Sequence, residues 1–266
     1  MSGQTTAFHN LGRWVYGLAG IALGIIGVVS RDFAAVWQPL ENLGADSHRA
    51  VIAVVFAAAL LLAGVVTLWR RTAPIGFLAL TVLHFISALG WIPRIFGNPG
   101  IFGVWNGLCE QLALVSAGVV GYASLMSPKG RVAQIGCLVF AFCAVSFAFG
   151  HFTAIRETTN FVPKWIPPGQ AFWAWATGVF HLLAGLAIGT GLQAALASRL
   201  LTAMMVGFGV LVWAPMLIAQ PSHFNWAGNA INLALVGAAW VIADSIASRR
   251  DSASPLLERS PGVQPL

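Results

Sequence analysis

Charged side chains are scarce in this chain of 266 residues. Aspartate, glutamate, lysine and arginine together make up 8% of the sequence, whereas 58% of it is hydrophobic. A soluble domain carries about 25% charged residues, because these cover its water-facing surface. The scarcity excludes a cytosolic enzyme, a secreted domain and a disordered chain, and it predicts a polytopic membrane protein.

Cysteine is also rare, with three residues and no C-x-x-C pair. Cys137 and Cys143 lie in one apolar stretch. On a helix they point about 120° apart and are separated by about 9 Å along the axis, so they cannot bridge each other. Together with Cys109 they predict core packing, which weighs against a thiol–disulfide mechanism.

Motifs for nucleotide binding, metallohydrolysis and serine catalysis are absent: there is no Walker loop, no H-E-x-x-H and no nucleophile elbow. The net charge is +6, but the basic residues stand singly or in pairs at the ends of apolar runs. Such scattered charge is typical of topology signals and lipid headgroup contacts. It excludes nucleic acid as a partner and indicates the lipid bilayer.

Proline, glycine and charge divide the chain into eight apolar segments of about the length that a membrane span requires. The sequence therefore predicts an all-α protein with eight transmembrane helices, at residues 12–30, 48–69, 73–95, 103–125, 131–151, 171–193, 199–219 and 225–246. The first is expected to be a retained helix, because no A-x-A cleavage signal follows it before Arg31. The polar, proline-containing segment 248–266 is expected to be a disordered tail.

The distribution of lysine and arginine predicts the orientation. If the N-terminus is inside, the inner side holds nine basic residues: Arg13, Arg70, Arg71, Lys129, Arg131, Arg199, Arg249, Arg250 and Arg259. The outer side then holds five: Arg31, Arg49, Arg94, Arg156 and Lys164. The positive-inside rule thus favours both termini in the cytoplasm.

The two halves of the chain match each other at an offset near 121 residues. The matching positions are Ala63-Gly64 with Ala184-Gly185, Leu80-Thr81 with Leu201-Thr202, Trp91-x-Pro93 with Trp213-x-Pro215, Trp105-x-Gly107 with Trp226-x-Gly228, and Leu112–Val115 with Leu233–Val236. We therefore expect two four-helix repeats, residues 1–126 and 127–247. Because four spans is an even number, both repeats face the same way, related by a pseudo-two-fold along the membrane normal, and a site is expected at their interface.

Polar residues inside the spans are the candidates for a site, because burying them in lipid is costly. Glu110 lies about two turns into the fourth segment, with Asn106 one turn above it and Gln111 beside it. Arg94 ends the preceding segment and could pair with Glu110. Two alternatives remain open: a structural clamp between two helices, or a functional carboxylate.

In the second repeat, Asn225, Asn229 and Asn232 share one helical face, and Asn232 matches Gln111. Each amide alone indicates a hydrogen bond between helices. Together with the polar face around Glu110, the set predicts one outward-facing polar pocket.

Histidines give a further set of candidates. His84 and His181 fall near mid-membrane, where a facing pair could ligate haem. A hydrogen-bonded core histidine is the favoured interpretation of each, and no further ligands cluster with them, so no metal site is expected. His151, near Arg156 and Glu157 at an outer helix end, is either part of an acid–base group or an ordinary solvated terminus.

The segment Phe161–Ala187 carries Gly178, His181, Ala184 and Gly185 on one expected helix, and Trp213-x-Pro215 follows. It resembles the DoxX-like family of small bacterial membrane proteins, whose unit is a four-helix bundle. The resemblance covers about residues 131–246; the first half has Leu60 where the second has His181. It implies a bacterial cytoplasmic membrane subunit linked to quinone-dependent oxidation.

Three functions stay open at this point. The first is a redox subunit that presents a quinone pocket to a membrane or periplasmic partner protein. The second is a carrier for a small molecule, favoured by the same-facing repeats. The third is a non-catalytic scaffold for other membrane proteins. The residues themselves do not firmly imply any cofactor; quinone is implied by the resemblance alone.

Overall fold

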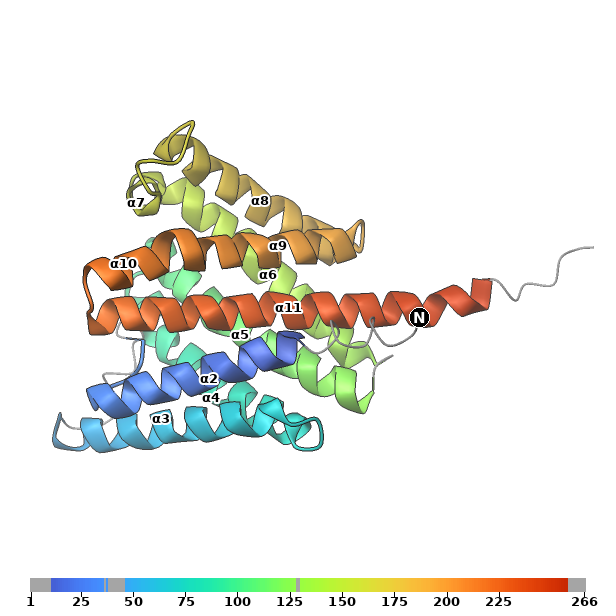
Figure 1. The fold of residues 1–266 in the computed structure, drawn as a ribbon, viewed down its shortest axis with the longest axis horizontal. Coiled ribbons are helices and arrows are strands. Elements are labelled where there is room, and N and C mark those ends of the chain that lie inside the picture. Colours follow the sequence, from blue (N-terminus) through green and yellow to red (C-terminus); the bar gives the residue numbers. More distant parts are fainter. Residues whose placement is uncertain (1–10, 36, 38–45, 128–129, 258–266) are drawn as a thin grey trace, which may run out of the picture.

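The computed structural model describes residues 11–35, 37, 46–127 and 130–257, and the regular secondary structure in these ranges is entirely helical (Figure 1). In chain order the helices are α2 (Leu11–Ser30), α3 (Asp46–Leu68), α4 (Ala73–Gly97), α5 (Phe102–Met126), α6 (Arg131–Thr153), α7 (Ile155–Phe161), α8 (Gln170–Thr190), α9 (Ala194–Phe208), η1 (Gly209–Trp213), α10 (Ala214–Ala219) and α11 (His223–Leu257).

Eight helical segments among the described residues are long and apolar enough to cross a membrane. The predicted all-α architecture with eight spans is confirmed, and the protein is an integral membrane protein. The segments lie close to the predicted ranges, but α9 begins at Ala194 rather than near residue 199. Residues 194–198 (AALAS) are rich in alanine, the strongest helix former, which accounts for the earlier start.

Helix α11 extends past residue 248, where the tail was expected to begin, and the disorder of the tail stays a prediction. The helix continues to Leu257 and so includes residues 248–257, for which disorder was expected. Part of the reason is local: Arg249 donates from Nε to the Ser245 carbonyl and from Nη2 to Cys137 Sγ on α6, at 3.3 and 3.1 Å. These contacts hold the helix against its neighbour beyond the apolar stretch. The remainder of the expected tail, 258–266, lies outside the described residues.

The span Ala194–Ala219 is broken in the middle. Five residues, Gly209–Trp213, form a π-helical turn, and Pro215 lies two residues beyond its end. Proline has no backbone N–H and cannot sustain the regular α-helical ladder, so the local repeat widens there. The amide side chains of Asn229 and Asn225 donate to carbonyls of this segment, at Trp213 (2.8 Å) and Met216 (3.3 Å).

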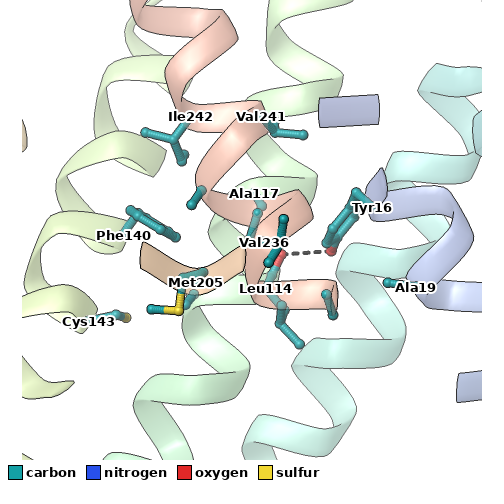
Figure 2. Close-up of a cluster of buried hydrophobic side chains, with 14 of the residues drawn as sticks. Tyr16, Ala19, Leu114, Ala117, Phe140, Cys143, Met205, Val236, Val241 and Ile242 are labelled. Atoms are coloured by element: carbon teal, nitrogen blue, oxygen red, sulfur yellow. Dashed lines mark hydrogen bonds between the residues drawn. The ribbon is translucent and has the colours of Figure 1, made fainter. Parts of the chain in front are cut away.

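Helices α5 and α11 form the centre of the bundle, with α2, α4, α6 and α9 packed around them (Figure 1). Tyr16 on α2 reaches inward, and its hydroxyl donates to the Leu114 carbonyl of α5 at 2.8 Å (Figure 2). Helix α2 lies very close to α11 because Gly237 has no side chain; a Cβ there would be 2.6 Å from the Tyr16 backbone. Small residues thus bring the helices together where lipid provides no hydrophobic driving force.

The two halves of the chain pack in the same order. In the first half α2 contacts α3, α3 contacts α4 and α4 contacts α5; in the second α6 contacts α8, α8 contacts α9 and α9 contacts α11. Between the halves, α2 meets α11, α5 meets α6 and α5 meets α11. Two same-facing copies would produce this pattern, and the repeat itself stays a prediction.

Candidate functional site

A cavity of about 760 Å³ lies between the two halves. Its walls come from α4 and α5 of the first half and from α6, α8, α9, η1 and α11 of the second, with α7 and residues 162–166 also lining it. The polar side chains in its wall are Asn106, Glu110, His151, Glu157, Thr158, Thr177, His181 and Asn232. A cavity of this size is typical of a binding site for a small organic molecule.

The cavity lies toward one end of the bundle, the end at which α4 and α6 finish and α5, α8 and α11 begin. The opposite end carries the start of α2 and the cytoplasmic loops of the predicted topology (Figure 1). Under that topology the cavity belongs to the outer half of the membrane.

Aromatic side chains form much of the wall: Trp37, Trp91, Phe147, Phe161, Trp173, Phe208 and Trp213. Two of these tryptophans lie at matching positions of the sequence repeat. The Trp91 ring packs against Gly107, and the Trp213 ring packs against Gly228, so closely that a Cβ on either glycine would overlap the ring. The two glycines therefore allow the indoles to pack directly against α5 and α11 in the wall of the cavity.

Glu110 is held in the wall by two side-chain donors. Trp37 Nε1 donates to Glu110 Oε1 at 3.2 Å, and Gln111 Nε2 donates to the same oxygen at 3.1 Å. Arg94 lies over the Trp91 ring with its guanidinium carbon 5.7 Å from the ring centroid, outside the cavity lining. The pairing of Arg94 with Glu110 stays a prediction.

Asn106 lies one turn from Glu110 and crosses toward the second half. Its amide packs against Gly150 of α6, where a Cβ would be 2.7 Å from Asn106 Nδ2. Its Oδ1 atom is buried and has no hydrogen-bond partner among the described residues. A buried carbonyl without a partner is costly, so this atom is a place where a ligand would be recognised.

On the facing wall, His181 is 2% exposed, and its Nδ1 atom also has no hydrogen-bond partner in the described structure. Its ring lies 5.3 Å from that of His151, with Phe147 and Phe208 against it at 5.6 and 6.3 Å. His151 Nδ1 lies 3.2 Å from the Thr177 hydroxyl. The two histidines thus sit in an aromatic cluster at the cavity surface.

The asparagines of α11 separate into two groups. Asn232 lines the cavity and donates from Nδ2 to the Met205 carbonyl at 3.2 Å. Asn225 and Asn229 do not line it; they bond the broken span, as described above. Asn225 and Asn229 thus form the hydrogen bonds between helical segments that the sequence indicated for each amide alone. Of the three asparagines, only Asn232 lines the cavity.

Gln111 and His84 belong to a second, much smaller cavity of about 30 Å³. Gln111 Oε1 accepts from His84 Nδ1 at 3.1 Å, and Gln111 is 2% exposed. His84 and His181 therefore line different cavities and contact different neighbours. His84 is a buried, hydrogen-bonded histidine, whereas His181 Nδ1 has no hydrogen-bond partner in the described structure.

Sequence reasoning missed two features. One is the aromatic lining of the cavity, because a sequence does not show which face of a helix a tryptophan occupies. The thiols of Cys109 and Cys143 form a side-chain contact between α5 and α6. The sequence analysis considered a pairing only for Cys137 and Cys143, which lie in one segment. No local feature of the sequence indicates that Cys109 and Cys143 are in contact.

Comparison of the chain with protein-family models, with curated proteins and with solved structures finds no match. The function must therefore be argued from the cavity.

Proposed function

We propose that this protein is a DoxX-like redox subunit of the bacterial cytoplasmic membrane that binds a quinone-type lipid in the cavity between its halves. The observation that carries the proposal is the cavity itself, whose aromatic walls enclose a few polar groups from both halves. Apolar pockets with a small number of convergent polar side chains are the usual form of a site for an organic ligand.

The lining residues fit a quinone headgroup. Flat indole and phenyl rings can stack on a planar ring, and His181 Nδ1, in the tautomer that carries its hydrogen there, can donate to one of the quinone oxygens. When bound, the quinone supplies two-electron chemistry: it takes up two electrons and two protons to become the quinol. The electrons come from or go to a partner protein, while the residues of this chain bind and orient the ring.

A lipid-soluble ligand also fits the position of the cavity. The span Ala194–Ala219 contributes Phe208, Leu211 and Trp213 to the wall, and in its most apolar 18-residue stretch only 17% of the residues are buried within the protein. One wall of the cavity is thus formed by a broken helix whose outer face is largely free for lipid. A quinone dissolved in the bilayer would reach the site without crossing a folded domain.

The proposal can be tested by measuring quinone binding to a variant in which a large side chain occupies the cavity. Gly103 lies on the α5 face of Asn106 and Glu110, and a Cβ there meets no atom within 4 Å. In full-length protein in lipid nanodiscs, Gly103→Phe should weaken saturable binding of decylubiquinone by roughly tenfold or more, an affinity loss of about 1.4 kcal/mol. Gly97→Phe is the matched control, since Gly97 has equal space but lies outside the cavity. Absence of saturable binding, or equal binding by both variants, would contradict the proposal.

A carrier is the second candidate, and the broken span favours it. The π-turn Gly209–Trp213 lines the cavity, and interrupted helices are common where transporters hold their substrates. A carrier requires that the cavity open alternately to both sides. Uptake of a labelled ligand into sealed liposomes, without any electron donor, would support the carrier over the redox subunit.

A further inference from the structure

We propose that the cavity selects the reduced form of its ligand, the quinol, over the quinone, through Asn106 on one half and His181 on the other. The inference rests on the proposed function and adds which redox form is bound and which residues distinguish it. It starts from the two buried polar atoms of the cavity wall that have no partner in the described structure, Asn106 Oδ1 and His181 Nδ1.

The two groups lie on opposite halves and are joined by a short series of contacts. The Asn106 amide packs on Gly150 of α6, the next residue of α6 is His151, and the His151 ring lies 5.3 Å from the His181 ring. Both groups also line the same cavity. In the proposed pose, a ring carrying an oxygen at each end contacts α5 with one oxygen and α8 with the other.

The wall presents several hydrogen-bond acceptors. Asn106 Oδ1 accepts only, and the carboxyl groups of Glu110 and Glu157 are acceptors when ionised. Lysine and arginine are absent from the described lining residues.

The side-chain donors of three lining residues are already engaged. Trp37 Nε1 donates to Glu110, Trp173 Nε1 donates to the Pro167 carbonyl at 2.9 Å, and the Thr177 hydroxyl donates to the Trp173 carbonyl at 2.7 Å. A ligand hydroxyl would therefore supply the hydrogen that Asn106 Oδ1 lacks.

The two redox forms differ in this property. A quinone has two carbonyl oxygens that only accept, so it leaves Asn106 Oδ1 buried without a partner. A quinol has two hydroxyl groups, each able to donate and accept, so one can donate to Asn106 while the other bonds His181. An unsatisfied buried acceptor costs roughly tenfold or more in affinity, so we expect the quinol to bind about tenfold more tightly.

The test compares three ligands with one ring system on full-length protein in nanodiscs: decylubiquinol, decylubiquinone and the di-O-methyl ether of the quinol. The ether keeps the ring but has no hydroxyl hydrogen. We expect the quinol to bind about tenfold more tightly than the other two. Asn106→Leu and His181→Phe should each reduce this preference, mainly by weakening quinol binding.

Matched controls are available for both variants. Asn160→Leu removes an amide from the exposed part of α7, and His223→Phe removes a histidine whose Nε2 is also unpartnered but lies outside the cavity. Both should keep the full preference. Equal affinity for quinol and quinone, tighter binding of the quinone, or a preference unchanged by Asn106→Leu and His181→Phe would overturn the inference while leaving quinone binding intact. Failure of all three ligands to bind would overturn the proposed function, and this inference with it.

Discussion

The imidazole rings of His151 on α6 and His181 on α8 lie in the wall of the cavity between the two halves, with their centroids 5.3 Å apart and their planes tilted by 37°. In the sequence they are separated by a short helix and a proline-containing segment, and they belong to different predicted features: a helix end and a mid-membrane position. The antiparallel packing of α6 and α8 brings them together at one level of the bundle. Two imidazole rings that can form hydrogen bonds therefore lie beside the aromatic surface that we assign to ligand binding.

Replacing His181 should separate its role in binding from its role in packing. His181→Phe keeps the ring and its contacts with Phe147 and Phe208 while removing an unpartnered nitrogen, so thermal stability should be unchanged or higher. His181→Ala leaves a void and should cost roughly 2–5 kcal/mol. Both variants should lose ligand affinity. Thermal denaturation in detergent, alongside ligand titration, makes the comparison; full binding by His181→Phe would reduce His181 to a packing residue.

Glu110→Gln should impair function more than stability. Glutamine keeps the volume of the side chain and an oxygen that can accept from Trp37 and Gln111, but it loses the charge that can titrate. Ligand affinity or electron transfer should therefore fall, while the melting temperature changes little. Unchanged function in Glu110→Gln would remove this residue from the site.

The predicted pairing of Arg94 with Glu110 can be measured by a double-mutant cycle. Arg94→Gln alone would leave the half-buried Glu110 carboxylate without its predicted countercharge, so it should destabilise more than the double variant Arg94→Gln, Glu110→Gln. Additive effects, within about 0.5 kcal/mol, would indicate that the two side chains act independently.

The glycines beneath the cavity tryptophans should not tolerate even one methyl group. A Cβ at Gly107 would overlap the Trp91 ring, so Gly107→Ala should destabilise by about 1–3 kcal/mol. Gly103→Ala, one turn earlier on α5, meets no atom and should be neutral or gain about 0.5–1 kcal/mol in helix propensity. Trp91→Phe, which leaves a smaller ring, should lessen the penalty at Gly107. Equal stability of the two alanine variants would show that the packing of Trp91 against α5 does not require a glycine at position 107.

All three cysteines are expected to be structural. They are buried, and Cys109 contacts Cys143, whereas Cys137 accepts a hydrogen bond from Arg249. A variant with alanine at all three positions should bind its ligand within a few-fold of the natural protein. Loss of function on replacing a single cysteine, with the fold retained, would instead indicate thiol chemistry between α5 and α6.

The orientation can be tested with cysteines introduced into the cysteine-free variant. Asn160 on α7 and Leu192 after α8 are exposed at opposite ends of the bundle. With both termini in the cytoplasm, a membrane-impermeant maleimide should label Asn160→Cys in intact cells, and Leu192→Cys only after permeabilisation. The reverse pattern would place the cavity on the cytoplasmic side.

The sequence by itself determined the class of protein and the positions of its spans. Both depend on local properties: an apolar segment of about 20 residues can span a bilayer whatever surrounds it. Asn106, Glu110, His151, His181 and Asn232 were also found from the sequence, because a polar side chain within a span stands out from its neighbours. What the sequence could not do was assign these side chains to one cavity.

Only the tertiary structure decided that assignment, because it depends on how each helix is rotated about its axis. Glu110 and Gln111 are adjacent, but one residue turns an α-helix by about 100°. Glu110 therefore lines the large cavity, whereas Gln111 lines the small one with His84. The same rotation turns Asn229 toward the carbonyls of the broken span and leaves Asn232 at the cavity. Packing between helices far apart in the chain fixes these rotations, and no property of a single span specifies them.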